Sequence, residues 1–229
     1  MTAAGLGDDV PQLDLPFKVT VISHPKEKKS KSSIIPSKII APSQVEIVST
    51  TDAPVLREEG EPEDSVVLLF PSENAKEMTQ LSEAELKAIK RVVLIDSTWN
   101  QTRAYLRSEN ISKLKMVKIQ TEKTVFWRYQ TGELDTSLAT IEALYFFFRD
   151  YDVALNCKDR LYSDYKGTFD NLLWFYAYNF KLIQNEYSKA NKNFLRIPGY
   201  IQNNPDSIFN NKDGEEKVVE SSTKRPRLE

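Results

Sequence analysis

The stretch Val92–Arg107, VVLIDSTWNQTRAYLR, decides the fold of this chain. Its first four residues form a short apolar run that is too brief for a helix and typical of a strand buried on both faces in a parallel sheet. Asp96 follows at the point where such a strand ends. Ser97 and Thr98 can cap the helix that the residues from Trp99 onward predict. Because ligands of open α/β sheets bind outside the carboxyl ends of the strands, this carboxylate, the two hydroxyls and the indole indicate a site.

Apolar patterning elsewhere predicts the rest of an α/β fold. The order strand, helix, strand around residues 66–95 implies parallel neighbours and places Phe70, Pro71 and Ser72 beside Asp96 at one edge of the sheet. We therefore expect a mostly parallel sheet flanked by helices. The expected strands lie at residues 17–23, 45–48, 66–70, 116–119 and 125–127, and the expected helices at 82–90, from a cap at Asp135, Thr136 or Ser137, and at 168–189.

Length and composition favour one globular domain with tails. The 229 residues can bury one substantial core. We expect a disordered tail at residues 1–15, a domain at 16–202 with an acidic loop at 50–64, and a second disordered tail at 203–229. The sequence has no apolar run long enough to span a membrane. Cys157 is the single cysteine, which excludes an internal disulfide and a thiolate-rich zinc site, and no metal is expected.

Charge predicts local rather than bulk contact with RNA. The net charge of −2 is not that of a protein that grips nucleic acid by overall electrostatics. Lys123 and Arg128 flank aromatic residues that include Trp127, so they combine charge with stacking surface; ordinary packing is the alternative. Lys28 and Lys29 lie on a loop that either is merely solvated or contacts phosphates.

Taken alone, an Asp-Ser-Thr cluster after a strand is most often only a helix cap. Here the cluster is followed and preceded by other elements in an order that resembles the DTW-domain family, and most of all the type 1 branch of its eukaryotic tRNA-uridine aminocarboxypropyltransferases. The resemblance covers about residues 17–183. The elements that carry it are DSTWNQ at 96–101, LFPS at 69–72, FWR at 126–128 and SLATIEA at 137–143.

The resemblance implies a reaction and a more specific fold. The implied reaction transfers the 3-amino-3-carboxypropyl group of S-adenosylmethionine, the co-substrate, to N3 of a tRNA uridine at D-loop position 20 and releases 5′-methylthioadenosine. The implied fold is SPOUT-like with a knotted C-terminal part. An RNA methyltransferase of SPOUT type is one alternative function, and a non-catalytic RNA-binding or scaffold protein is another.

The resemblance also suggests roles for residues at the site. Asp96 is the candidate base for the N3 proton, or else it holds a positive charge of the donor. Trp99 either faces the sulfonium or the target base, or packs on the sheet. Ser137 and Leu138, at an expected helix start, suit a carboxylate or phosphate. The full set expected to contact the donor is Phe70, Pro71, Ser72, Asp96, Ser97, Thr98, Ser137, Leu138 and Thr140.

Two further expectations concern the ends of the chain and its surroundings. Members of the family commonly carry a cysteine-rich segment ahead of the domain, and this sequence has none, so it is either a shortened form or from a lineage without that module. The basic cluster at residues 224–227 matches a nuclear localisation patch. We expect a protein of the nucleus, and also of the cytoplasm, that acts on tRNA; the sequence leaves the oligomeric state open and favours a monomer.

Overall fold

In the part of the chain that the structure describes, six parallel strands form a sheet that is the middle layer of the fold, in the order β2-β1-β5-β3-β6-β4. The computed structural model describes residues 10–120, 122–124 and 137–189, apart from the side chains of Lys31, Trp99 and residues 184–189. The α/β class with a parallel sheet is thereby confirmed. The strands are β1 Lys18–Ser23, β2 Val45–Ser49, β3 Val66–Leu69, β4 Lys76–Glu77, β5 Arg91–Asp96 and β6 Lys115–Lys118.

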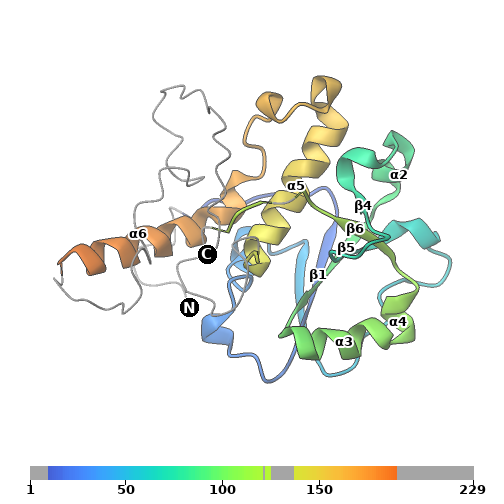
Figure 1. Ribbon diagram of the computed structural model, residues 1–229, viewed down its shortest axis with the longest axis horizontal. Coiled ribbons are helices and arrows are strands. Elements are labelled where there is room, and N and C mark those ends of the chain that lie inside the picture. Colours follow the sequence, from blue (N-terminus) through green and yellow to red (C-terminus); the bar gives the residue numbers. More distant parts are fainter. Residues whose placement is uncertain (1–9, 121, 125–136, 190–229) are drawn as a thin grey trace, which may run out of the picture.

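Helices cover both faces of this sheet, with α5 on one side and α3 and α4 on the other (Figure 1). The α-helices are α1 Ser37–Ile40, α2 Glu83–Ala88, α3 Trp99–Arg107, α4 Glu109–Ser112, α5 Thr140–Asn156 and α6 Trp174–Lys189. The 3₁₀ helices are η1 Lys29–Lys31, η2 Glu63–Ser65, η3 Met78–Gln80, η4 Lys158–Arg160, η5 Tyr162–Asp164 and η6 Asp170–Leu173.

Strand β5 shows how the sequence divides the core between the two faces. Val92 and Leu94 belong to the larger cluster, which contains the buried aromatic side chains of α5. Val93 belongs to the smaller cluster, together with Tyr105 of α3 and Ile111 of α4. Successive side chains of a strand point to opposite faces, so the apolar run serves both layers at once.

The central stretch folds as its sequence predicts. Strand β5 ends at Asp96, which is in register with Ser23 at the end of β1. Helix α3 begins at Trp99, and the Thr98 N–H donates to Gln101 Oε1 at 2.9 Å, so the cap lies at Thr98. The capping box before α2 is also confirmed, because Ser82 and Glu85 exchange hydrogen bonds between backbone and side chain.

Two helices begin later than expected. Helix α5 starts at Thr140, so its cap is Ala139 and not one of residues 135–137, because the Glu142 carboxylate accepts the Ala139 N–H at 2.7 Å and thereby satisfies the N-cap donor. Helix α6 starts at Trp174 and not at residue 168. Residues 170–173 instead form the 3₁₀ turn η6, which leads directly into α6.

The N-terminal segment is packed over part of the range expected to be a tail. Val10 and Leu15 are buried, and the Leu13 N–H donates to the Ile40 carbonyl at 2.8 Å. Residues 10–15 therefore belong to the folded domain. The expected strand at 125–127, residues 1–9 and the tail from 203, with its basic cluster, lie outside the described residues. The C-terminal knot also stays a prediction, because the chain between β6 and α5 is described only in part.

Candidate active site

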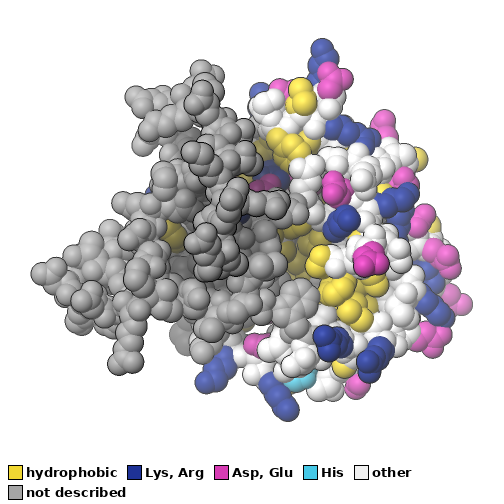
Figure 2. Space-filling model, in the orientation of Figure 1, with side chains coloured by type: hydrophobic (Ala, Val, Ile, Leu, Met, Phe, Trp, Pro, Cys, Tyr) yellow, Lys and Arg dark blue, Asp and Glu magenta, His cyan; other side chains and the backbone are white. Residues whose placement is uncertain are grey.

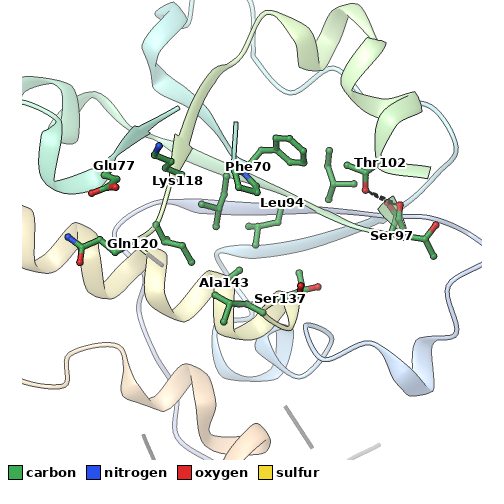
Figure 3. Close-up of a pocket in the computed structure, with 16 residues that line it drawn as sticks. Phe70, Glu77, Leu94, Ser97, Thr102, Lys118, Gln120, Ser137 and Ala143 are labelled. Atoms are coloured by element: carbon green, nitrogen blue, oxygen red, sulfur yellow. Dashed lines mark hydrogen bonds between the residues drawn. The ribbon is translucent and has the colours of Figure 1, made fainter. Parts of the chain in front are cut away.

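A pocket of about 750 Å³ lies at the carboxyl ends of β3, β5 and β6, beside the first turn of α5 (Figure 3). This is the edge of the sheet at which the sequence predicts a site. Apolar side chains and hydroxyl groups make up most of its wall. The lining residues are Leu69, Phe70, Pro71, Glu77, Leu94, Ile95, Ser97, Thr98, Thr102, Lys118, Ile119, Gln120, Ser137, Leu138, Thr140 and Ala143.

Asp96 lies next to the pocket wall and joins three segments of the chain. Its Oδ1 accepts a hydrogen bond from Thr140 Oγ1 at 2.6 Å, and its Oδ2 accepts one from Ser32 Oγ at 2.8 Å. The residue is half-buried and is not itself among the lining residues, although its neighbours Ile95 and Ser97 are. Each carboxylate oxygen has two lone pairs, so one acceptor position on each remains after these bonds.

The Asp96–Thr140 bond brings together the two most distinctive motifs of the chain. Asp96 opens the D-S-T-W element, and Thr140 belongs to the S-x-x-T-x-E-A run 44 residues later. The contact follows from the alternation of β5. Leu94 faces the side covered by α5, so Asp96, two residues further on, faces the start of that helix.

Ser97 and Thr98, two of the residues predicted to contact the donor, line the pocket. Ser97 Oγ lies 2.9 Å from Thr102 Oγ1 (Figure 3), and Thr102 Oγ1 in turn donates to the Thr98 carbonyl at 3.0 Å. Thr102 is 5% exposed. These hydroxyls fix the turn between β5 and α3. Trp99 starts α3, and its side chain lies outside the described part of the structure.

The start of α5 contributes a wall but fewer backbone donors than its sequence suggests. Ser137, Leu138 and Thr140 line the pocket. Because α5 begins at Thr140, the N–H groups of Ser137 and Leu138 are not part of its first turn, which corrects the helix-start argument for an anion site there. Two of the next donors are occupied: the Ala139 N–H bonds to Glu142, and the Ile141 N–H donates to Ser33 Oγ at 3.3 Å.

The end of β3 forms another side of the pocket. Phe70 and Pro71 line it, whereas Ser72 does not. The Phe70 N–H donates to the Val117 carbonyl at 2.9 Å, which continues the sheet pairing one residue beyond β3. Ser72 Oγ is buried without a hydrogen-bond partner in the described part of the structure. The predicted proximity of residues 70 and 71 to the end of β5 is therefore observed.

Sequence reasoning did not identify the polar end of the pocket formed by Glu77, Lys118 and Gln120. Glu77 of β4 and Lys118 of β6 are direct register partners on neighbouring strands. In Figure 3 these residues lie at the opposite end of the view from Ser97 and Thr102. The missed signal was Lys118, the lysine that ends strand β6 at the same edge of the sheet as Asp96. The two-residue strand β4 has no pattern that sequence alone could reveal.

A largely buried ionic cluster on α5 and on the chain after β6 contacts the backbone of Gln120, at the polar end of the pocket. Arg149 Nη2 lies 2.6 Å from Glu122 Oε1 and 3.0 Å from Asp150 Oδ1. Asp150 Oδ2 also accepts the Gln120 N–H at 3.3 Å. Asp150 is 1% exposed, and burial raises the pKa of its carboxyl even though the neighbouring arginine opposes that change. The cluster ties the chain that follows β6 to α5.

The residues predicted to bind RNA are only partly described. Lys28 and Lys29 are exposed on the loop that leads from β1 to Ser32, and Lys123 is exposed beyond β6. Trp127 and Arg128 lie outside the described residues. Figure 2 shows basic and acidic side chains interspersed over the described part of the visible face, which agrees with the small net charge.

The described ranges contain neither a cluster of metal-ligating side chains nor a membrane-spanning helix. In the parts of the chain that the structure describes, no group of three or more His, Cys, Asp and Glu side chains is arranged to hold a metal ion. Among the helices within these same ranges, none combines the length and the apolar character that crossing a bilayer requires.

A parallel α/β domain whose polar motifs converge at the carboxyl ends of its strands is of the class that binds its ligand at that edge. Residues 5–183 match the sequence profile of the DTW domain, and the chain belongs to this family. The expected family membership is therefore confirmed.

Curated relatives cover most of the chain. It is 32% identical over 224 residues to tRNA-uridine aminocarboxypropyltransferase 1 of Mus musculus, which covers 81% of this chain and 71% of that protein. The protein of the same name from Homo sapiens is 32% identical over 215 residues, with 77% and 68% covered. That of Xenopus laevis is 29% identical over 223 residues, with 81% and 74% covered. No solved structure matches the chain.

Proposed function

We propose that this protein transfers the 3-amino-3-carboxypropyl group of S-adenosylmethionine to N3 of a tRNA uridine and releases 5′-methylthioadenosine. The observation that carries the proposal is the Asp96–Thr140 bond, which joins the two family motifs beside the pocket. The names of the relatives supply the transferred group and the acceptor. We further propose D-loop position 20 as the target, on the family resemblance alone.

The pocket fits a donor of this size and chemistry. Its volume of about 750 Å³ lies within the roughly 300–1,000 Å³ of small-molecule sites. Its wall combines apolar surface for a purine with hydroxyl groups for a ribose and with charged groups of both signs. The donor supplies a carbon made electrophilic by the sulfonium. When the N3–carbon bond forms, the carbon–sulfur bond breaks, and its electron pair remains on sulfur.

The residues at the end of β5 have complementary roles in this proposal. Asp96 accepts the N3 proton through an acceptor position that Ser32 and Thr140 leave available, or it holds the donor's positive charge. Trp99 is assigned to stack on the sulfonium or the uracil. Ser97 and Thr98 are assigned to the donor that the pocket encloses.

The remaining assignments follow the walls of the pocket. Phe70 and Pro71 border the adenine, and Ser72 supports their turn. Ser137, Leu138 and Thr140 close the pocket from the side of α5. Lys28, Lys29, Lys123, Trp127 and Arg128 are assigned to the tRNA.

The decisive experiment uses the donor labelled separately in its methyl and in its carboxypropyl carbons. The purified protein is incubated with each form and a tRNA, and the nucleosides are separated by mass spectrometry. We expect only the carboxypropyl label to reach a uridine, and replacement of U20 by C should abolish incorporation. Transfer of the methyl label would instead support the SPOUT-type methyltransferase, and the absence of both labels would support a non-catalytic RNA-binding protein.

A further inference from the structure

Among the described residues that line the pocket, the charged ones are Glu77 and Lys118. Both are half-buried, and they sit opposite each other on β4 and β6. Neither forms an ion pair within the described part of the chain. Lys76 and Lys115, on the same two strands, are paired, since both reach the carboxylate of Glu85. Lys118 and Glu77 both line this end of the pocket (Figure 3), where the Glu77 carboxylate also accepts the Gln80 N–H in the capping box of η3 and keeps further lone pairs for a ligand.

A ligand that is complementary to the Glu77–Lys118 end of the pocket must carry a positive and a negative charge close together. Charges withdrawn from water need partners, and a cation beside an anion is complemented by the reverse arrangement. The amino-acid end of the donor has a carboxylate and an ammonium on one carbon, whereas its adenosine end has no formal charge. An RNA phosphate could pair with Lys118, but Glu77 would repel it. The observations therefore favour the donor's amino-acid end over RNA.

We propose that Lys118 binds the carboxylate and Glu77 the ammonium of the arm that is transferred. This inference rests on the proposed function and extends it. The backbone donors near the start of α5, the other candidates for the carboxylate, are partly taken by Glu142 and Ser33. Fixing the amino-acid end also selects the reaction, because three carbons on the sulfonium are open to attack and only the one held toward N3 reacts.

The structure holds this end of the pocket rigid. The backbone two residues beyond Lys118 is fixed by the hydrogen bond from the Gln120 N–H to Asp150. Asp150 is held in turn by Arg149, whose guanidinium lies 4.6 Å from the centre of the Phe146 ring. A site whose supports are packed in this way keeps its charges in place before the ligand arrives.

The test compares two ligands that share the adenosine end: one carries the amino-acid arm on a positively charged sulfur, and the other lacks the arm and has a neutral sulfur. Binding of S-adenosylmethionine and of 5′-methylthioadenosine to the full chain is measured by titration calorimetry, for the wild type, Lys118→Met and Glu77→Gln. We expect Lys118→Met to weaken the affinity for S-adenosylmethionine about 10- to 100-fold, as the loss of a hydrogen bond to a charged group implies. 5′-Methylthioadenosine should bind equally well to both proteins. Lys76→Met is the matched control and should alter neither affinity.

Each other outcome overturns the proposal in a recognisable way. If Lys118→Met weakens the affinity for both ligands equally, Lys118 binds the adenosine or stabilises the fold, and not the carboxylate. A second variant, Lys118→Arg, then shows whether a positive charge alone restores binding. Unchanged affinity for S-adenosylmethionine combined with weaker tRNA binding would assign the lysine to RNA. If the wild type binds neither nucleoside, the donor itself is wrong and the proposed function fails with it. If it binds both and the variants behave like the wild type, only the charge pair fails.

Discussion

Replacing Asp96 by asparagine separates the chemical role of this residue from its structural one. The substitution keeps the shape of the side chain and removes its charge. Two hydroxyl groups, of Ser32 and Thr140, now donate to the carboxylate. In the variant one of them faces an NH₂ group, and a hydroxyl can rotate to accept that hydrogen. We therefore expect Asp96→Asn to fold.

The magnitudes follow from these two contacts. A hydrogen bond to a charged group contributes about 1.5–3 kcal/mol and a neutral one about 0.5–1.5 kcal/mol, so losing the charge from both costs roughly 1–3 kcal/mol. For a domain of this size, 1 kcal/mol lowers the melting temperature by about 2–4 °C. Loss of a general base costs about 10²–10⁴ in rate, which is far more than this loss of stability explains.

The matched control is Thr140→Val, which removes one of the two hydrogen bonds and keeps the carboxylate. Transfer of the carboxypropyl label to tRNA is measured under single turnover, together with thermal unfolding. We expect Asp96→Asn to lose about 10²–10⁴ in rate and Thr140→Val to lose about tenfold or less. A base affects kcat, whereas a partner for the donor's charge affects KM. Asp96→Asn activity within about threefold of wild type would refute both roles, and equal losses in the two variants would make Asp96 a positioning residue.

Three further predictions concern stability and RNA. Arg149→Met should lower the free energy of unfolding in urea by roughly 3–5 kcal/mol, because it leaves a buried carboxylate unpaired; Lys87→Ala, which breaks an exposed pair, should leave it nearly unchanged. The backbone and side chain of Ser82, together with Lys115, lower the pKa of Glu85 to about 2, so its stabilisation is complete above pH 4.5 and is lost as the pH falls from there toward 2. Melting temperatures across that interval should accordingly fall less steeply in Glu85→Gln, and an unchanged slope would contradict this assignment. Lys28→Ala and Lys29→Ala should weaken tRNA binding and reduce the slope of log affinity against log salt by about 0.7–0.9 for each phosphate that the variant no longer neutralises; an unaltered slope would place the RNA elsewhere.

The central part of the fold could be predicted because its signals are local. An apolar run followed by Asp96 and a hydroxyl cap specifies a buried strand, its end and the helix after it within one short stretch, Val92–Arg107. The predicted neighbourhood of Phe70 and Asp96 needed one more rule, that parallel strands present their carboxyl ends at the same edge. Both predictions agree with the register of β3 and β5.

Contacts between distant polar residues could not be predicted in the same way. The Ser32–Asp96 bond spans 64 residues and involves one serine among several in a basic loop, which carries no periodic signal. The start of α5 was misplaced for a related reason. Alanine is a poor cap, so sequence reasoning favoured the hydroxyl and carboxyl groups at residues 135–137. The Glu142 side chain satisfies the N-cap donor from inside the helix and makes Ala139 acceptable.

Helix α5 is the element that relates the two ends of the pocket. At one end Thr140 ties its first residue to Asp96, and at the other Asp150 ties its third turn to the chain beyond Lys118. The proposed reaction must hold the acceptor nitrogen at one place and the amino-acid end of the donor at another, since choosing among three sulfonium carbons requires two fixed points. Hydrogen bonds attach both ends of the pocket to α5, which is packed on the sheet. The distance between the two ends is therefore set by the core of the protein and not by its loops. The position of α5 on the sheet then determines the selectivity for the longest arm of the donor. Substitutions of core residues beneath α5 should therefore change which group is transferred before they abolish binding of the donor.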